Sequence, residues 1–307
     1  MSEVSSMWLW GTALAASAAE AHQTLTGEAA IALLALFLLS FLIGLISPMA
    51  GIGGGVLFTP IMLAFTPVNA DLVRGTGIAM VAANSLTASG AFLKAGVANL
   101  RLGLLAGISA AVLAAVGAIA RPPRGPLLDL LLGLLMMSVV LVYNVIRGGV
   151  EYPKPGNSDP LSDRLHLNSS YYDIAINERV TYRVVRPALG TLLFGVMGLI
   201  SGAFGVGAGW GAVPIANLIM KVPIRPAITT SQLIMSISAV TATWVYVLQG
   251  AVVPLMTVPA LVGGMMGVTL GSRMAVRVKA RYMRYAVLTI MTFTSIRLIL
   301  MGSGLWR

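Results

Sequence analysis

Long apolar stretches separated by short polar segments dominate this chain. Ten stretches can be distinguished, at residues 29–49, 52–68, 75–93, 99–119, 126–146, 187–204, 206–220, 228–248, 253–275 and 283–301. Stretches of this length are typical of membrane-spanning helices, and the sequence lacks the alternating ten-residue pattern of barrel strands. The pattern therefore predicts an all-α polytopic membrane protein with about ten transmembrane segments.

The ten stretches fall into two groups of five, and the sequence repeats between the groups. Residues 44–61 (GLISPMAGIGGGVLFTPI) align without a gap to residues 198–215 (GLISGAFGVGAGWGAVPI) at an offset of 154, with nine of 18 positions identical. An odd number of spans in each copy reverses the second copy in the membrane. The sequence therefore predicts two inverted five-segment repeats, a common build of secondary transporters, whose site lies where the copies meet.

The polar segments complete the predicted organisation. We expect an N-terminal segment at 1–28, a first transmembrane repeat at 29–147, a cytoplasmic linker at 148–186 and a second transmembrane repeat at 187–307. The linker mixes charged, aromatic and β-branched residues after a turn-rich start, which favours a short hairpin or surface helix. Residues 7–21 could be a signal peptide, but no Lys or Arg precedes them, so we favour a mobile or surface-lying segment.

Composition and charge place the chain in lipid and orient it. Hydrophobic residues make up 57% of the chain and charged residues 10%, whereas soluble proteins carry about 25% charged residues. With the N-terminus outside, the inner loops hold fifteen Lys and Arg residues and the outer loops three, Arg74, Arg121 and Arg124. We therefore expect a multi-pass protein of the inner (plasma) membrane with its N-terminus outside. The net charge of +10 reflects the basic inner loops and does not indicate nucleic-acid binding.

Metal, thiol and enzyme chemistry are not expected. The chain has no cysteine, and its two histidines lie outside the apolar stretches. Paired ionisable residues within the spans, the usual sign of an intramembrane enzyme, are missing from the sequence. We therefore predict a protein that is not an enzyme and that uses no metal or cofactor.

The glycine-rich segments are the first candidates for a binding site. Each set of glycines is followed by a proline: Gly51, Gly53, Gly54 and Gly55 before Pro60, and Gly205, Gly207 and Gly209 before Pro214. Each glycine costs about 1 kcal/mol of helix propensity and each proline removes a donor, so broken helices are expected. A helix that begins at such a break presents N–H groups and partial positive charge to an anion. The alternative is close helix packing through the Gly-x-x-x-Gly spacing.

Polar residues in the spans that follow extend this candidate site. Asn84 and Gln232 carry amide donors that can hold an oxyanion without adding charge. Thr76 and Thr230 occupy equivalent places in the two copies. For any one serine or threonine we favour interhelical hydrogen bonding, whereas for the two amides binding and packing are equally favoured.

The repeated G-L-I-S-x-x-x-G-[IV]-G-[GA]-G segment resembles the sulfite exporter TauE/SafE family, also called the 4-toluene sulfonate uptake permease family. The resemblance covers residues 30–146 and 187–300. It implies an inner-membrane carrier of sulfur-containing anions such as sulfite or organosulfonates, with a small anion and the lipid bilayer as its partners. An inside-negative membrane favours anion export by about 2.3 kcal/mol per charge per 100 mV, and no ion-coupling residue is evident, so we expect export.

The alternative function is a non-transporting membrane scaffold or assembly protein that acts through the cytoplasmic linker. A carrier moves an anion across a liposome membrane, and a scaffold does not. A channel would lack saturable, counterflow-stimulated uptake.

Overall fold

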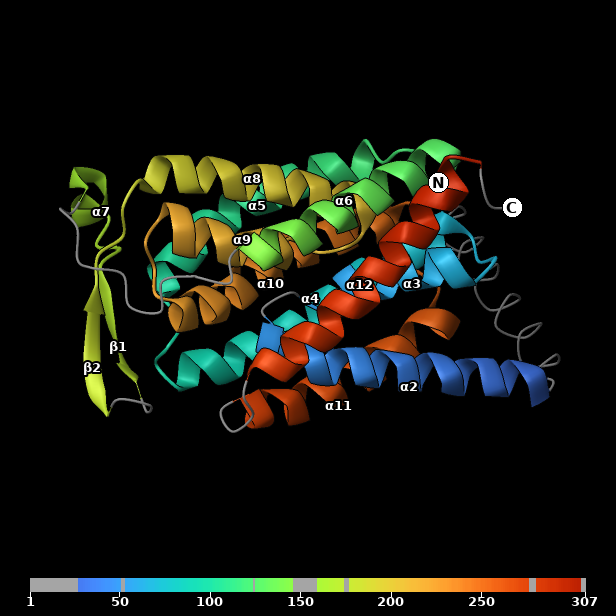
Figure 1. Ribbon diagram of the computed structural model, residues 1–307, viewed down its shortest axis with the longest axis horizontal. Coiled ribbons are helices and arrows are strands. Elements are labelled where there is room, and N and C mark those ends of the chain that lie inside the picture. The colour runs from blue at the N-terminus through green and yellow to red at the C-terminus, as the bar shows by residue number, and fades with distance from the viewer. Residues whose placement is uncertain are drawn as a thin grey trace, which may run out of the picture.

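The computed structural model describes residues 27–50, 53–123, 125–145, 159–173, 177–275 and 280–304, which form a helical bundle (Figure 1). The first half contains α2 (Gly27–Ala50), α3 (Gly55–Phe65), α4 (Ala70–Lys94), α5 (Leu100–Ile119) and α6 (Pro126–Val145). The second half contains α8 (Pro187–Phe204), α9 (Gly209–Pro214), the π-helix η2 (Ile215–Ile219), α10 (Ile224–Leu248), α11 (Pro254–Ala275) and α12 (Ala280–Gly302).

The two halves match element by element. Adding 154 to the bounds of α3 gives residues 209–219, which form α9 and η2, and adding it to the bounds of α4 gives α10. Helices that correspond in the two halves also make corresponding contacts. α2 packs on α11, and their counterparts α8 and α5 pack on each other. α4 packs on its own counterpart α10, and α6 packs on its own counterpart α12. The duplication in the sequence is therefore carried into the helix contacts.

The equivalent helices α4 and α10 run in opposite directions. At the start of α4, a Cβ atom on Gly75 would overlap the carbonyl oxygen of Ala251, which follows α10. At the start of α10, the hydroxyl of Thr230 accepts a hydrogen bond from the backbone N–H of Asn99, which follows α4, at 2.9 Å. The start of each helix thus lies beside the end of the other.

Six of the described helices are long and apolar enough to cross a membrane: Ala30–Pro48, Ala70–Lys94, Leu100–Ile119, Pro187–Phe204, Ile224–Leu248 and Pro254–Arg273. α3 has 11 residues, so it is about 16 Å long, roughly half the thickness of a bilayer core. α9 and η2 together are equally short. A helical, polytopic membrane protein is confirmed. The apolar pattern predicted full membrane spans at 52–68 and 206–220, but the helical segments there are about half the length of a full span.

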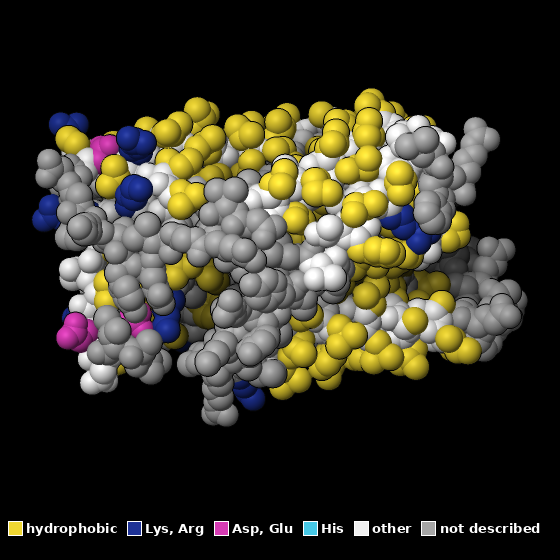
Figure 2. All heavy atoms as spheres, in the orientation of Figure 1, with side chains coloured by type: hydrophobic (Ala, Val, Ile, Leu, Met, Phe, Trp, Pro, Cys, Tyr) yellow, Lys and Arg dark blue, Asp and Glu magenta, His cyan; other side chains and the backbone are white. Residues whose placement is uncertain are grey.

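The flank of the bundle is apolar, as a surface in contact with lipid must be. Figure 2 shows hydrophobic side chains along the bundle and charged side chains gathered towards its two ends. Large side chains such as Ile31, Ile108 and Leu192 are more than half exposed on α2, α5 and α8. Soluble monomers rarely expose apolar patches of this extent, which supports membrane insertion.

Glycines bring two equivalent pairs of helices into close contact. A Cβ atom on Gly271 of α11 would overlap the carbonyl oxygen of Leu45 on α2. At the equivalent place, a Cβ atom on Gly117 of α5 would overlap the carbonyl oxygen of Leu199 on α8. Small-residue packing therefore holds α2 to α11 and α8 to α5.

The linker between the halves forms a small folded unit at one end of the bundle. It contains α7 (Pro160–Arg164) and the antiparallel strands β1 (Ser169–Asp173) and β2 (Glu178–Tyr182). The expected hairpin and surface helix are therefore both present. We call this end of the bundle the linker end, and the opposite end, where residues 120–123 and 249–253 lie, the far end.

The linker contacts loops from both halves. The carboxylate of Asp173, which is 1% exposed, pairs with Nη1 of Arg225 on α10 at 2.8 Å. The side-chain amide of Asn99 donates to the carbonyl oxygen of Leu167 at 2.7 Å. Burial raises the pKa of the Tyr182 hydroxyl, whose oxygen also accepts from Asn99 at 3.3 Å. The linker is therefore fixed to the ends of the membrane helices.

The close glycine contacts predict opposite effects for matched alanine substitutions. Gly117→Ala is expected to lower the free energy of unfolding by about 1–3 kcal/mol, because its methyl group forces α5 away from α8. Gly90→Ala in α4 is the control, since a Cβ atom there would meet nothing within 4 Å, and it is expected to stabilise by up to about 1 kcal/mol. Unfolding in detergent measures both, and equal stability of the two variants would contradict the packing.

Candidate functional site

The first glycine segment interrupts the helical chain. α2 ends at Ala50 and α3 begins at Gly55, and Gly53 between them has a φ of +53°, a conformation that favours glycine. The carbonyl oxygen of Gly54 accepts hydrogen bonds from the N–H groups of Leu57 and Phe58, at 3.1 and 3.0 Å, which starts α3. The first N–H groups of α3 have no acceptor within their own helix and lie at its positive end. Gly51, also expected in the site, lies outside the described residues.

The second glycine segment interrupts the chain at the equivalent place. α8 ends at Phe204 and α9 begins at Gly209. Gly205 and Gly207 between them have φ values of +65° and +80°. Gly207 is the counterpart of Gly53, so the two halves share a left-handed glycine at the same position. Broken helices are therefore present in both halves at the predicted glycines, whereas Pro60 lies inside α3 and Pro214 is the last residue of α9.

α4 and α10 bring the two breaks together. A Cβ atom on Gly53 would lie 2.7 Å from Sδ of Met235 on α10, and one on Gly207 would lie 3.0 Å from Cγ2 of Val81 on α4. Met235 and Val81 are themselves 154 residues apart, so each glycine contacts the residue that corresponds to the partner of the other glycine. Because a Cβ atom on Gly53 would also lie 3.5 Å from Val81, the side chain of Val81 lies beside both breaks.

A direct hydrogen bond also joins the two halves at the breaks. The hydroxyl of Thr59 on α3 donates to the carbonyl oxygen of Gly205 at 2.8 Å. A Cβ atom on Gly55 would lie 3.2 Å from the carbonyl oxygen of Val206. The short helix of the first half is thus seated on the break of the second half.

Asn84 is a buried amide beside the first break. Asn84 is 1% exposed, and neither its Oδ1 nor its Nδ2 has a hydrogen-bond partner among the described residues. Its Nδ2 lies 2.8 Å from the place of a Cβ atom on Gly54. An unpaired buried amide costs about 1–3 kcal/mol, so its presence in the folded protein requires an explanation.

Gln232 is a second buried amide with an unpartnered donor. It is 1% exposed, and its Nε2 has no acceptor within the described ranges. It lies on α10, three residues before Met235, which contacts Gly53. The two amides expected from the sequence are therefore both buried on α4 and α10, the helices that pack against the breaks.

Thr76 and Thr230 are engaged in contacts between helices. The hydroxyl of Thr76 lies 3.2 Å from the hydroxyl of Thr257 near the start of α11. The hydroxyl of Thr230 accepts from the backbone N–H of Asn99 at the start of α5. Because α11 is the counterpart of α5, each threonine holds the start of an equivalent helix, which is the packing role weighed for such residues.

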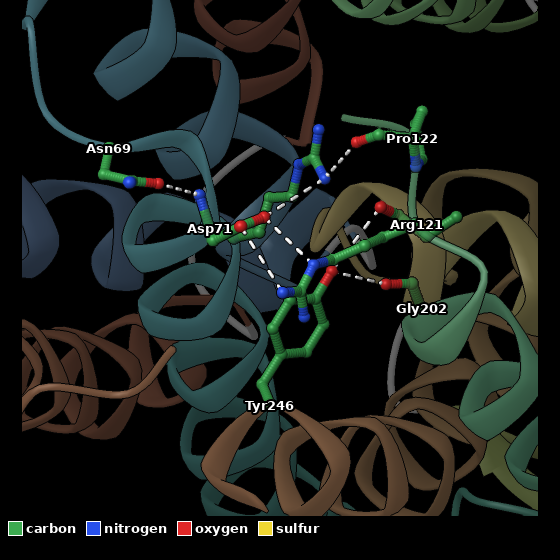
Figure 3. A network of polar contacts seen from close by, with 8 residues as sticks. Asn69, Asp71, Arg121, Pro122, Gly202 and Tyr246 are labelled. Carbon is green, nitrogen blue, oxygen red and sulfur yellow. Dashed lines mark hydrogen bonds and ion pairs between the residues drawn. The ribbon is translucent and has the colours of Figure 1, made fainter. Parts of the chain in front are cut away.

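The sequence interpretation missed a buried ionic cluster at the far end, drawn in Figure 3. Arg74 was expected in an outer loop, but it lies in α4 and is 0% exposed. The side chain of Asn69 accepts from the N–H of Asp71 at 2.8 Å and caps the helix, which therefore begins at Ala70, before Arg74. The Asn-x-Asp pattern is a helix-start signal that could have revealed this.

The cluster joins three charged side chains and a tyrosine. Asp71 Oδ1 lies 3.5 Å from Nη1 of Arg74 and 3.1 Å from Nε of Arg121. The guanidinium of Arg121 lies 5.6 Å from the ring centroid of Tyr246 on α10. The Tyr246 hydroxyl donates to the carbonyl oxygen of Gly202 on α8 at 2.9 Å. The cluster therefore connects the two halves at the far end.

A membrane bundle whose equivalent halves meet at two broken helices has the architecture of a secondary transporter. The family model described as Sulfite exporter TauE/SafE matches residues 36–298, and the chain belongs to this family. It is also similar to the Probable membrane transporter protein YunE of Bacillus subtilis (strain 168), with 23% identity over 269 residues, 83% of this chain and 94% of that protein. No solved structure matches the chain. The family resemblance seen in the sequence is confirmed.

The unpaired amide of Asn84 predicts that an apolar substitution at this position does not destabilise the protein. Asn84→Leu, which is nearly the same size, is expected to leave the free energy of unfolding unchanged or to raise it, because it removes an unsatisfied buried amide. Asn99→Leu is the matched control, since its side chain donates to Leu167 and accepts from the N–H of Leu102, and it is expected to cost about 1–3 kcal/mol. Unfolding in detergent compares them, and a larger loss for Asn84→Leu would show that this amide serves stability.

Proposed function

We propose that this protein carries a sulfur-containing anion, sulfite or an organosulfonate, outwards across the inner membrane. The observation that carries the proposal is the buried amide of Asn84 beside the start of α3, which has no hydrogen-bond partner among the described residues. Helix N-termini and neutral amides hold an oxyanion by donating hydrogen bonds without adding a full charge. A site without a fixed cation binds an anion and releases it again more readily than one built on arginine.

The proposed site is shared by the two breaks. The N–H groups of Gly54 and Gly55, with the Asn84 amide, bind the anion from the first half. Gly207, Gly209 and the Gln232 amide approach it from the second half, and Gly51 and Gly205 give both breaks their shape. Thr76 and Thr230 fix the helices that enclose the site.

We propose that the halves are inverted repeats and that the site opens to the two sides in turn. The offset of 154, the corresponding helix contacts and the opposite directions of α4 and α10 support this. The breaks are buried, and Val81 and Met235, both 0% exposed, lie against them. This arrangement is a closed conformation, which must loosen around Val81 and Met235 before an anion passes.

The charge distribution supports a cytoplasmic linker end and an external N-terminus. The basic residues at the linker end lie at helix ends or beside them, and such basic segments are retained in the cytoplasm: Lys94, Arg101, Lys221 and Arg225. The membrane potential then drives an anion from the linker end to the far end, by about 2.3 kcal/mol per charge per 100 mV. Export of this kind needs no coupling ion.

The linker contacts favour the carrier over the scaffold. Asp173 and Leu167 are bound to Arg225 and Asn99 of the same chain, so the buried side of the linker is used for contacts within the protein. The linker therefore serves first to join the cytoplasmic ends of the two halves.

Sulfite flux into proteoliposomes tests the proposed function. Gly53→Leu and Gly207→Leu are each expected to reduce the flux at least about tenfold, because a side chain there is strained at positive φ and fills the space beside Met235 or Val81. Gly90→Leu is the matched control and should transport normally, since nothing lies within 4 Å of a Cβ atom there.

The outcomes separate the candidate functions. Normal flux in both leucine variants, with normal insertion, would reject the glycine site. A wild-type protein that moves none of sulfite, thiosulfate, sulfate or an aryl sulfonate would favour the scaffold. Saturable uptake that is stimulated by anion inside the liposome would identify a carrier and exclude a channel.

A further inference from the structure

The far-end cluster contains more positive than negative charge. Two guanidinium groups, those of Arg74 and Arg121, share the carboxylate of Asp71. The side chain of Arg74 is 0% exposed and that of Arg121 is 23% exposed, whereas that of Asp71 is 42% exposed. The arginines are therefore held inside the bundle, and the carboxylate is the member that can turn towards water.

The arginines also have more donors than the surrounding protein uses. Nη1 of Arg74 donates to the carbonyl oxygen of Pro122 at 2.7 Å. Nε and Nη2 of Arg74 and Nη1 of Arg121 are buried without a hydrogen-bond acceptor in the part of the chain that the structure describes. Burying a charged group with unused donors is costly, and the planar guanidinium fork matches the oxygens of an oxyanion.

The cluster adjoins the second glycine break. A Cβ atom on Gly205 would lie 2.6 Å from the carbonyl oxygen of Arg74 and 2.8 Å from its Cβ atom. Arg74 and Asn84 lie on the same helix, ten residues apart, which corresponds to about 15 Å. An anion that leaves the proposed central site towards the far end therefore meets this cluster next.

We infer that Arg74 and Arg121 form a second oxyanion site. The carboxylate of Asp71 occupies this site until an anion displaces it. The ligand class is a small anion with three oxygens on one central atom, such as sulfite or a sulfonate. The inference rests on the proposed function, because that function supplies the anion. The site has the opposite chemistry to the central one: full positive charge attracts the anion, and the returning Asp71 carboxylate releases it.

A lipid phosphate offers the same chemistry, but the geometry favours a free anion. Arg74 is 0% exposed and lies against Gly205 and the loop at Pro122. A headgroup tethered to two acyl chains reaches the edge of such a bundle more readily than its interior. The site is therefore assigned to a free oxyanion.

Equilibrium binding of sulfite to the purified full-length protein in uncharged detergent tests this site. The Asn84→Leu background isolates it, because that change removes the central amide. Asp71→Asn is expected to tighten sulfite binding about tenfold, because it removes the competing charge, and Arg121→Gln to weaken it about tenfold. Arg101→Gln is the matched control: this arginine donates to the carbonyl oxygen of His166 at the linker end, and its loss should leave the Kd unchanged.

The opposite signs distinguish binding from a structural role. If Asp71 and Arg121 only hold the far end together, both substitutions lower the unfolding temperature and neither changes the Kd, which would overturn the inference. Arg121-dependent stabilisation by phosphatidylglycerol in mixed micelles, without any by sulfite, would assign a lipid and also overturn it. Opposite shifts in Kd with no flux in wild-type liposomes would leave the oxyanion site standing and reject the proposed transport.

Discussion

Every backbone N–H and C=O group within a membrane needs a partner, and this requirement shapes the centre of the molecule. A break in a membrane helix exposes such groups, so it is tolerated only where protein or a polar cavity covers it. Here α4 and α10 cover the breaks, with Val81 and Met235 packed against Gly53 and Gly207. The same cover places the buried Asn84 amide beside the start of α3. The helices that cover the backbone at the breaks thus also carry the residues of the proposed binding site.

Duplication explains why the arrangement occurs twice, and the ends of the molecule show where the copies have diverged. Asp71 near the start of α4 and Arg225 near the start of α10 are 154 residues apart, and each takes part in an ion pair. At the linker end Arg225 meets the buried Asp173. At the far end Asp71 meets two arginines and leaves an excess of positive charge. Equivalent frameworks therefore carry different electrostatics at the two ends.

Much of this fold could be predicted from the sequence, because its strongest signals are local. Apolar length indicated the helices, and the clustered glycines indicated both breaks. Half-length segments were read as full spans because apolarity continues across a break, where the chain leaves the helical conformation at the positive-φ glycines Gly53, Gly205 and Gly207. The cover of the breaks could not be predicted, since Val81 and Met235 look like any lipid-facing residues until the offset pairs them. Buried Arg74 was placed in a loop because its charge outweighed the helix-start signal at Asn69.

The central claim is that two helix breaks from opposed halves hold one oxyanion. A crystal structure of the protein with selenite, a heavier relative of sulfite, tests it directly through the anomalous signal of selenium. The account predicts a selenium peak within hydrogen-bonding distance of the Gly54 and Gly55 N–H groups and the Asn84 amide, with Gly207 on its other side. A transport-competent protein whose selenium peaks all lie away from both breaks would contradict it.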